Sequence, residues 1–229
     1  EHRRRLSTTQ FLAVTGSNGK TTTKELLAAV LGAGFKTFVT PGNLNNHIGL
    51  PLSILRIEAG TEIAVLEMGD NHPGEIAYLT QIGAPTVAVV TNAQRAHLAG
   101  MGDMNQIARE KGSIFAGLVE GGVAVVNADD AYADLWRRMA GSHVLRTFGI
   151  ERAADVRAVV RQQGLTTLLV LWTPEGRAEL KLAVPGRHNA RNALAAAAAC
   201  LAAGIPLAAV VAGLEGIAGL KGRLQRRKG

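Results

Sequence analysis

Short runs of β-forming residues alternate with helical stretches over most of this chain, and this alternation constrains the fold more than any other feature. It predicts strands at 10–15, 36–40, 63–67, 86–91, 123–127 and 143–148, and helices ending near 31 and spanning 49–55, 75–81 and 104–118. The alternation is typical of βαβ units, which build a parallel sheet with helices on its faces.

The pattern changes after residue 148. Three β-rich runs at 156–161, 166–172 and 178–184 are joined by Gln-Gln-Gly and Pro-Glu-Gly turns, which predict a small antiparallel meander. Two helices are expected after it, at 189–203 and 207–214. We therefore expect one α/β domain over residues 1–229, with a mostly parallel sheet flanked by helices and a small antiparallel subsheet.

Composition narrows the class of protein. Hydrophobic residues make up 47% of the 229 residues, which is too much apolar surface for a disordered chain. No apolar run reaches the roughly 18–20 residues that a membrane-spanning helix needs, so no membrane partner is expected. The single cysteine, Cys200, excludes an internal disulfide framework and fits a reducing compartment. We expect a cytoplasmic protein that acts as a monomer.

The formal net charge of +7 is confined to the two ends of the sequence. Three arginines lie at 3–5 and five basic residues lie within 221–229, while the stretch 6–220 carries no net charge. Aromatic residues, which would stack on bases, make up only 4%. Basic ends on a neutral body do not form a groove-reading surface, so no nucleic-acid partner is expected.

The strongest chemical signal is the segment 15–22, Thr-Gly-Ser-Asn-Gly-Lys-Thr-Thr, between the first predicted strand and helix. Its glycines let backbone N–H groups surround phosphate oxygens at a helix N-terminus. The Lys20 ammonium can reach the β- and γ-phosphates, and the Thr21 hydroxyl can bind Mg²⁺. Val14 stands where the usual motif has its first glycine, so this P-loop is a shortened variant. The alternative is a simple helix-capping turn.

Other polar clusters follow the predicted strands, at the edge where open α/β sheets bind ligands. Asn45 and Asn46 follow the second strand, Glu67 ends the third and His97 lies after the fourth. Glu67 is placed like the Mg²⁺-binding acid of P-loop enzymes. Taken singly, each has a plainer interpretation: a turn for the asparagines and a solvated loop residue for the other two.

Two further clusters lie on predicted helices. Lys111 is in the middle of the helix at 104–118, where a lysine is ordinarily solvated. Asn189 and Asn192 belong to the run Gly-Arg-His-Asn-Ala-Arg-Asn at 186–192. Taken alone, Asn189 is a good N-cap for the Ala-rich helix that follows.

Taken together, these segments resemble the Mur ligase family, the ATP-dependent amide-forming enzymes of peptidoglycan synthesis. The resemblance runs from about Phe11 to Arg223 and includes the shortened P-loop, the 42–51 loop, the 67–75 segment after the acidic strand end, 92–98 with 111–115, and 188–192. Within the family, the chain is most similar to members that add D-Ala-D-Ala to UDP-N-acetylmuramoyl-tripeptide. Folylpolyglutamate synthetase and other members of the superfamily remain an alternative.

The resemblance implies roles for single residues. Gly16, Ser17, Asn18, Gly19, Lys20, Thr21, Thr22, Asn189, Asn192 and Arg223 would bind ATP, Asn189 on the adenine side and Arg223 near the γ-phosphate. Thr21 and Glu67 would hold one Mg²⁺, with His97 and a carbamylated Lys111 at a second. Lys20, His97 and Lys111 would serve catalysis, and Asn45 with Asn46 would bind the peptide substrate.

The implied reaction has two steps. The tripeptide carboxylate attacks the γ-phosphate of ATP to give an acyl phosphate, and the amine of D-Ala-D-Ala then displaces phosphate. Mur ligases have three domains, and this chain resembles only the central ATP-binding one, so the N-terminal UDP-binding and C-terminal domains are expected to be absent. The chain alone is then expected not to ligate. The remaining alternative is a nucleotide-binding module without turnover of its own.

Overall fold

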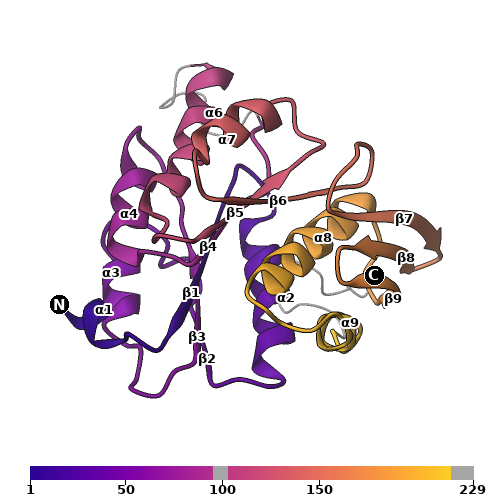
Figure 1. Cartoon of the computed structure of the whole chain (residues 1–229), viewed down its shortest axis with the longest axis horizontal. Helices are drawn as coiled ribbons and strands as arrows, with labels where there is room; N and C mark the ends of the chain where they lie inside the picture. The colour runs from indigo at the N-terminus through magenta and orange to yellow at the C-terminus, as the bar shows by residue number, and fades with distance from the viewer. Residues whose placement is uncertain (95–102, 218–229) are drawn as a thin grey trace, which may run out of the picture.

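A nine-stranded sheet runs through the residues that the computed structural model describes, 1–94 and 103–217. Its strand order is β2-β3-β1-β4-β5-β6-β7-β8-β9 (Figure 1). The strands are β1 (Gln10–Thr15), β2 (Thr37–Val39), β3 (Ile63–Glu67), β4 (Val87–Val90), β5 (Val123–Asn127), β6 (Val144–Gly149), β7 (Val156–Gln163), β8 (Thr166–Thr173) and β9 (Gly176–Leu182). These bounds confirm the strands that the sequence pattern predicts, and each strand end lies within two residues of its predicted position.

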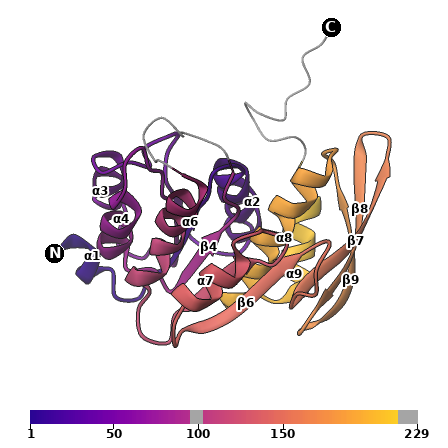
Figure 2. The same ribbon diagram turned by 90° about the horizontal axis from the view of Figure 1, so that it is seen from above.

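The strands from β2 to β7 pair in parallel, whereas β7, β8 and β9 pair antiparallel. The predicted antiparallel subsheet is therefore confirmed, and it continues the main sheet. The join is short: Phe148 pairs with Val156 and Gly149 pairs with Arg157. Figure 2 shows the meander extending from one edge of the molecule.

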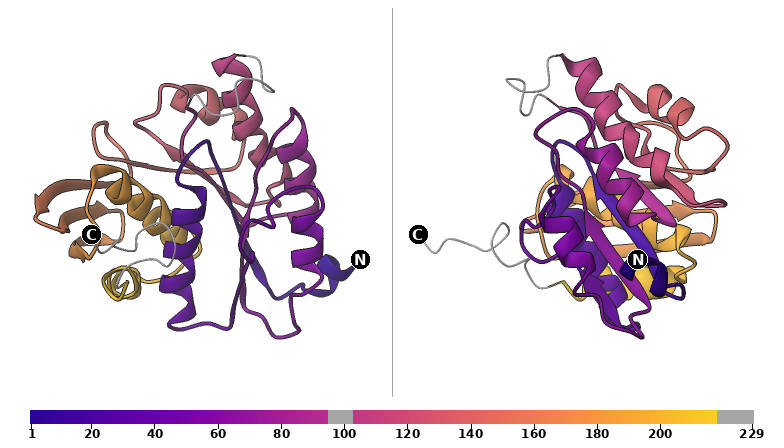
Figure 3. Two further views of the ribbon diagram at one scale, coloured as in Figure 1. Left: turned by 180° about the vertical axis from the view of Figure 1, so that it is seen from behind. Right: turned by 90° about the vertical axis from the view of Figure 1, so that its left-hand side faces the viewer.

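Helices cover both faces of the parallel strands (Figures 1 and 2). On one face lie α2 (Lys20–Gly32), α8 (Arg187–Ala202) and α9 (Leu207–Glu215). On the other lie α3 (Gly49–Ile54), α4 (Glu75–Gly83), α6 (Met104–Gly112), the 3₁₀ turn η1 (Ser113–Gly117) and α7 (Ala133–Met139), with the short α1 (His2–Arg5) beside them. Seen from behind, the two helical layers lie on opposite sides of the sheet (Figure 3, left).

Alternation along the strands divides the core between these two layers. In β1, Leu12 and Val14 join the cluster beneath α2 and α8, while Phe11 and Ala13 join the cluster beneath α4 and α6. All four side chains are fully buried. Successive side chains of a strand point to opposite faces, so a parallel strand covered on both sides is apolar throughout.

The order of the strands creates the site. β1 lies between β3 and β4, so the chain leaves β1 toward β2 and β3 on one side and continues to β4 on the other. A reversal of this kind opens a crevice at the carboxyl ends of the strands, where open α/β sheets bind ligands. The P-loop follows β1, and Glu67 is the last residue of β3.

Two details of the helices differ from the sequence prediction. The helix expected at 104–118 ends at Gly112 and continues as η1, whose last residue, Gly117, lies so close to Thr80 that an added Cβ would be 2.5 Å from the Thr80 backbone. The pattern also missed α7, whose main anchor is the fully buried Trp136; the indole N–H donates to the Ala108 carbonyl at 2.8 Å. A helix of seven residues is too short to show clear periodicity.

Cys200 lies fully buried in α8, and burial raises the pKa of its thiol. We expect the native chain to resist a disulfide reagent such as dithionitrobenzoate, because the reactive thiolate is both scarce and shielded. The same reagent should modify one thiol per chain in denaturant. Fast, complete modification under native conditions would contradict this burial.

No helix in the ranges 1–94 and 103–217 is long and apolar enough to span a membrane.

Candidate functional site

The loop after β1 has a backbone that requires glycine at two positions. Gly16 has φ +144° and Gly19 has φ +81°. A Cβ on Gly16 would lie 2.0 Å from the Thr91 hydroxyl oxygen, and one on Gly19 would lie 2.3 Å from the Asn192 carboxamide oxygen. Both the dihedral angles and the close contacts exclude larger residues.

The helix behind this loop begins with exposed donors. α2 starts at Lys20 with Gly19 as its N-cap, and no side chain from the described residues caps it. The side-chain capping expected in the alternative interpretation is therefore absent, although the glycine turn does start the helix. The first N–H groups of an uncapped helix, with the positive end of its dipole, form an anion-binding site.

The end of β4 holds the loop in place. The Thr91 hydroxyl donates to the Asn18 carbonyl at 2.7 Å, and the Asn92 carboxamide donates to the same oxygen at 2.8 Å. The Asn18 backbone N–H donates to the Asn92 side-chain oxygen at 3.0 Å. The Gln94 backbone N–H donates to the Ser17 hydroxyl oxygen, also at 3.0 Å. The loop is thus held in shape by protein contacts before any ligand arrives.

A second brace fixes the residues that follow β4. The Asp130 carboxylate accepts hydrogen bonds from the backbone N–H groups of Ala93 at 3.0 Å and Tyr132 at 2.9 Å. Burial raises the pKa of the Asp130 carboxyl, while these two hydrogen bonds oppose the shift. The brace connects the end of β4 to the loop after β5.

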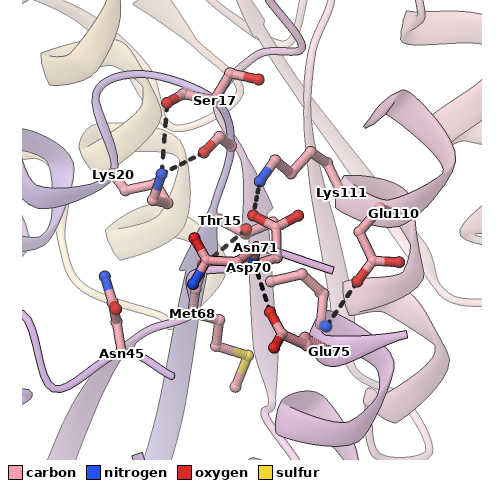
Figure 4. A network of polar contacts seen from close by, with 12 residues as sticks. Thr15, Ser17, Lys20, Asn45, Met68, Asp70, Asn71, Glu75, Glu110 and Lys111 are labelled. Atoms are coloured by element: carbon pink, nitrogen blue, oxygen red, sulfur yellow. Dashed lines mark hydrogen bonds and ion pairs between the residues drawn. The ribbon is translucent and has the colours of Figure 1, made fainter. Parts of the chain in front are cut away.

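Lys20 lies along the same loop. Its ammonium donates to the Gly16 carbonyl at 2.6 Å and approaches the Ser17 carbonyl at 3.5 Å (Figure 4). The ammonium is therefore held at the glycine turn, beside the N-terminus of α2. This is the place that the sequence motif predicts for a phosphate-binding lysine.

Glu67 connects three segments. Its Oε1 accepts hydrogen bonds from the Thr21 hydroxyl at 3.1 Å and from the Asn45 carboxamide at 2.8 Å. The residue is 2% exposed, and its Oε2 accepts no hydrogen bond within the described part of the chain. The structure thus brings Thr21, Glu67 and Asn45 together, and the interpretation of Glu67 as a solvated loop acid is wrong.

The sequence did not single out Lys24, which is also part of this cluster. It is 1% exposed, and its ammonium lies 3.4 Å from Glu67 Oε2. One signal was present: Lys24 follows Lys20 by four residues, so both lie on the same side of α2. It was passed over because a helical lysine is ordinarily solvated.

The two loop asparagines have different surroundings. The Asn45 backbone carbonyl accepts the Gly69 N–H at 2.8 Å, in addition to the carboxamide contact with Glu67. The Asn46 carboxamide oxygen instead accepts the N–H groups of Ile48 at 3.2 Å and Gly49 at 2.7 Å, at the start of α3. The turn interpretation therefore describes Asn46, whereas Asn45 belongs to the site.

Lys111 is buried rather than solvated. It is 3% exposed and forms a salt bridge with Asp70 (Figure 4). Asp70 Oδ1 takes this contact, and Oδ2 accepts no hydrogen bond from the residues described. Asp70, three residues after Glu67, is a second buried carboxylate at this edge that the sequence reasoning did not select.

Glu110, next to Lys111 on α6, holds the segment that carries Asp70. Its two carboxylate oxygens accept the N–H groups of Gly74 and Ile76, each at 2.8 Å, at the start of α4. Glu75 accepts the N–H groups of Asn71 at 2.6 Å and His72 at 3.1 Å. Figure 4 shows these side chains below the P-loop.

The start of α8 completes the site from the other side. α8 begins at Arg187 with Gly186 as its N-cap, so the N-cap interpretation of Asn189 is wrong. The buried Asn189 carboxamide donates to the Pro185 carbonyl at 2.6 Å. Asn192, one turn along, packs against Gly19 of the P-loop. Asn192 therefore lies beside the P-loop, although about 170 residues separate the two in sequence.

The available ligands suit a hard divalent cation. The Thr21 hydroxyl, the Glu67 carboxylate and Asp70 Oδ2, which accepts no hydrogen bond from the described residues, are oxygen donors of the kind that Mg²⁺ prefers. The described ranges contain no group of three or more His, Cys, Asp or Glu side chains that could hold a metal ion. The donor set fits a magnesium ion that shares its coordination with phosphate oxygens.

Of the predicted site residues, His97 and Arg223 lie outside the described residues.

Comparison with known proteins agrees with this geometry. Residues 14–200 match the Mur ligase middle domain. The UDP-N-acetylmuramoyl-tripeptide–D-alanyl-D-alanine ligase of Escherichia coli (strain K12) is 42% identical over 217 residues, which are 94% of this chain and 48% of that protein. The enzyme of the same name from Bacillus subtilis (strain 168) is 39% identical over 210 residues, covering 91% of this chain and 45% of that protein.

Solved structures show the same similarity. A crystal structure of MurF from Acinetobacter baumannii matches with a TM-score of 0.94 and 38% identity, covering 99% of this chain and 51% of that chain. MurF ligase from Thermotoga maritima in complex with ADP matches with a TM-score of 0.86 and 32% identity, covering 97% and 52%. The chain thus spans about half the length of the relatives that it matches.

Proposed function

Because this chain belongs to the Mur ligase family and matches its middle domain, we propose that it is the ATP-binding part of a ligase that joins D-Ala-D-Ala to UDP-N-acetylmuramoyl-tripeptide. The observation that supports this best is the meeting of the P-loop, Thr21 and buried Glu67 at the point where the strand order reverses. The named relatives supply the substrates of the proposal.

Each part of the site has a task in this proposal. The N-terminus of α2, with Thr22 in its first turn, and the Lys20 ammonium bind the ATP phosphates, and Gly16, Ser17, Asn18 and Gly19 shape the loop around them. Asn189 and Asn192 bind on the adenine side, and Arg223 approaches the γ-phosphate. Asn45 orients the bound peptide substrate, with Asn46 holding the loop in which it lies.

Thr21 and Glu67 would hold Mg²⁺ at the phosphates, with His97 and Lys111 at a second ion. When bound, Mg²⁺ neutralises charge that builds up on the transferred phosphoryl group. A carbamate on Lys111 would place a second anion beside Asp70, so we expect that modification only with a cation between the two groups. In the chain as described, Lys111 instead pairs directly with Asp70.

The reaction that we propose forms and breaks bonds in two steps. A carboxylate oxygen of the tripeptide attacks the γ-phosphorus, which gives an acyl phosphate and releases ADP. The D-Ala-D-Ala amine then attacks the acyl carbon, loses a proton and displaces inorganic phosphate. The protein contributes by binding both reactants in line and by stabilising the phosphoryl charge. We place this reaction in the cytoplasm, in a monomeric enzyme.

Two measurements test the proposal. Calorimetry on the 229-residue chain should show ATP binding that Mg²⁺ strengthens. The protein from the complete reading frame that contains the chain should then yield ADP, phosphate and the ligated pentapeptide precursor, detected by mass spectrometry. Magnesium-dependent ATP binding without any ligation would favour the nucleotide-binding module, and no ATP binding at all would contradict both.

A further inference from the structure

We infer that Lys24 is a positioning residue, which fixes the Glu67 carboxylate and the loop after β2 relative to the P-loop helix. Its ammonium donates to the Thr40 carbonyl at 3.1 Å and to the Gly42 carbonyl at 3.0 Å. The same nitrogen lies 3.4 Å from Glu67 Oε2. One buried cation on α2 thus contacts the segment after β2 and the end of β3.

Packing alone does not account for a lysine at this position. Its side chain is 1% exposed, and burying an ammonium costs free energy unless each N–H finds an acceptor. The two loop carbonyls accept hydrogen bonds from the ammonium, and the carboxylates of Glu67 and Glu25, at 3.4 and 3.2 Å, form ion pairs with it. An apolar side chain would fill the space at lower cost, but it would leave both the loop and Glu67 without this anchor.

The contact decides how the Glu67 carboxylate is oriented. Lys24 lies on the Oε2 side, while Thr21 and Asn45 donate to Oε1. The loop is tied from the other direction as well, because the Thr40 hydroxyl accepts the Glu67 N–H at 3.1 Å. Lys24 is three residues after Thr21 on the same helix, so one helix carries both the anchor and the hydroxyl that donates to Glu67.

The consequence for metal binding rests on the proposed function. In a Lys24→Met variant, the phosphate-binding loop and Lys20 are unchanged, so ATP affinity in the presence of a chelator should stay within about twofold of the wild type. The gain in ATP affinity on adding Mg²⁺ should fall by about tenfold, because Glu67 is no longer held toward Thr21. A residue that served stability alone would not change this ratio.

The experiment combines two readouts on the whole chain. Hydrogen exchange without any ligand should become faster in peptides covering 41–49 and 66–70 of Lys24→Met, where the Gly69 N–H bonds to Asn45 and the Glu67 N–H to Thr40. Calorimetry with ATP, with and without Mg²⁺, gives the affinity ratio. The matched control is Lys36→Met, which removes a half-exposed lysine that pairs with Glu58 at 3.2 Å; neither readout should change. Lys24→Arg keeps the positive charge, so its hydrogen-exchange rates and its Mg²⁺-dependent gain in ATP affinity should lie between those of Lys24→Met and the wild type.

Each outcome decides the inference. Unchanged exchange in both peptides and an unchanged Mg²⁺ ratio in a folded Lys24→Met variant would overturn it. If that variant does not fold, Lys24→Gln, which keeps one donor for the loop carbonyls, is judged by the same two readouts. In a Glu67→Gln background, Lys24→Met should not lower the ratio further, and a full additional loss would also overturn it. If Mg²⁺ fails to strengthen ATP binding in the wild type, the proposed function fails, while the exchange measurement still decides whether Lys24 positions the loop.

Discussion

Replacing Lys20 with alanine should weaken ATP binding by about 100-fold, since two charge-assisted hydrogen bonds to phosphate oxygens contribute about 3 kcal/mol. The ammonium is held at the glycine turn by the Gly16 carbonyl at 2.6 Å, beside the uncapped N-terminus of α2. Calorimetry measures the affinity, and thermal unfolding checks that the variant is folded.

The control for this prediction is Lys36→Ala, which removes a lysine remote from the P-loop and should leave ATP affinity unchanged. The loop itself should keep its shape in Lys20→Ala, because Thr91 and Asn92 hold it from the end of β4. A folded Lys20→Ala variant that binds ATP like the wild type would remove the P-loop from the nucleotide site.

Replacing Lys111 with methionine should lower the free energy of unfolding by about 3–5 kcal/mol, the usual cost of leaving one member of a buried ion pair alone. Lys111 is 3% exposed, its partner Asp70 is 8% exposed, and Asp70 Oδ2 accepts no hydrogen bond among the described residues. Without the ammonium, the Asp70 carboxylate would be buried with no cation beside it. Urea unfolding of the ligand-free chain in a chelator measures the change.

Two comparisons test the physical reason. The double variant Lys111→Met with Asp70→Leu removes both charges and should recover most of the lost stability, because replacing a whole buried pair with apolar side chains is often neutral. Arg137→Met breaks the surface pair with Asp134, at 2.7 Å, and should cost less than about 1 kcal/mol. Equal losses from Lys111→Met and Arg137→Met would show that the buried pair contributes no more than a surface one.

Features that are local in the chain could be predicted from the sequence. The segment 15–22 predicts a phosphate-binding loop, because a glycine turn followed by Lys-Thr at a strand–helix junction has few other uses. The strands were found because their apolar runs are continuous and bounded by turn residues, and Glu67 stood out because it ends one of them. The assignment of roles to Asn45, Asn189 and Lys111 needed the resemblance to Mur ligases.

Which of these residues meet could be seen only once the chain was folded. Asn45 and Lys24 converge on Glu67, Asp70 pairs with Lys111, and Asn192 fills the space beside Gly19. The tertiary structure also shows that the antiparallel meander continues the parallel sheet through β6 and β7. The side-chain contacts join residues from about 20 to 170 positions apart, and they depend on the order in which the strands assemble. Periodicity reports which face of a strand or helix is buried, but it carries no information about which element lies next to it. A lysine on a helix is therefore solvated or buried according to its neighbours in space, as Lys24 and Lys111 show.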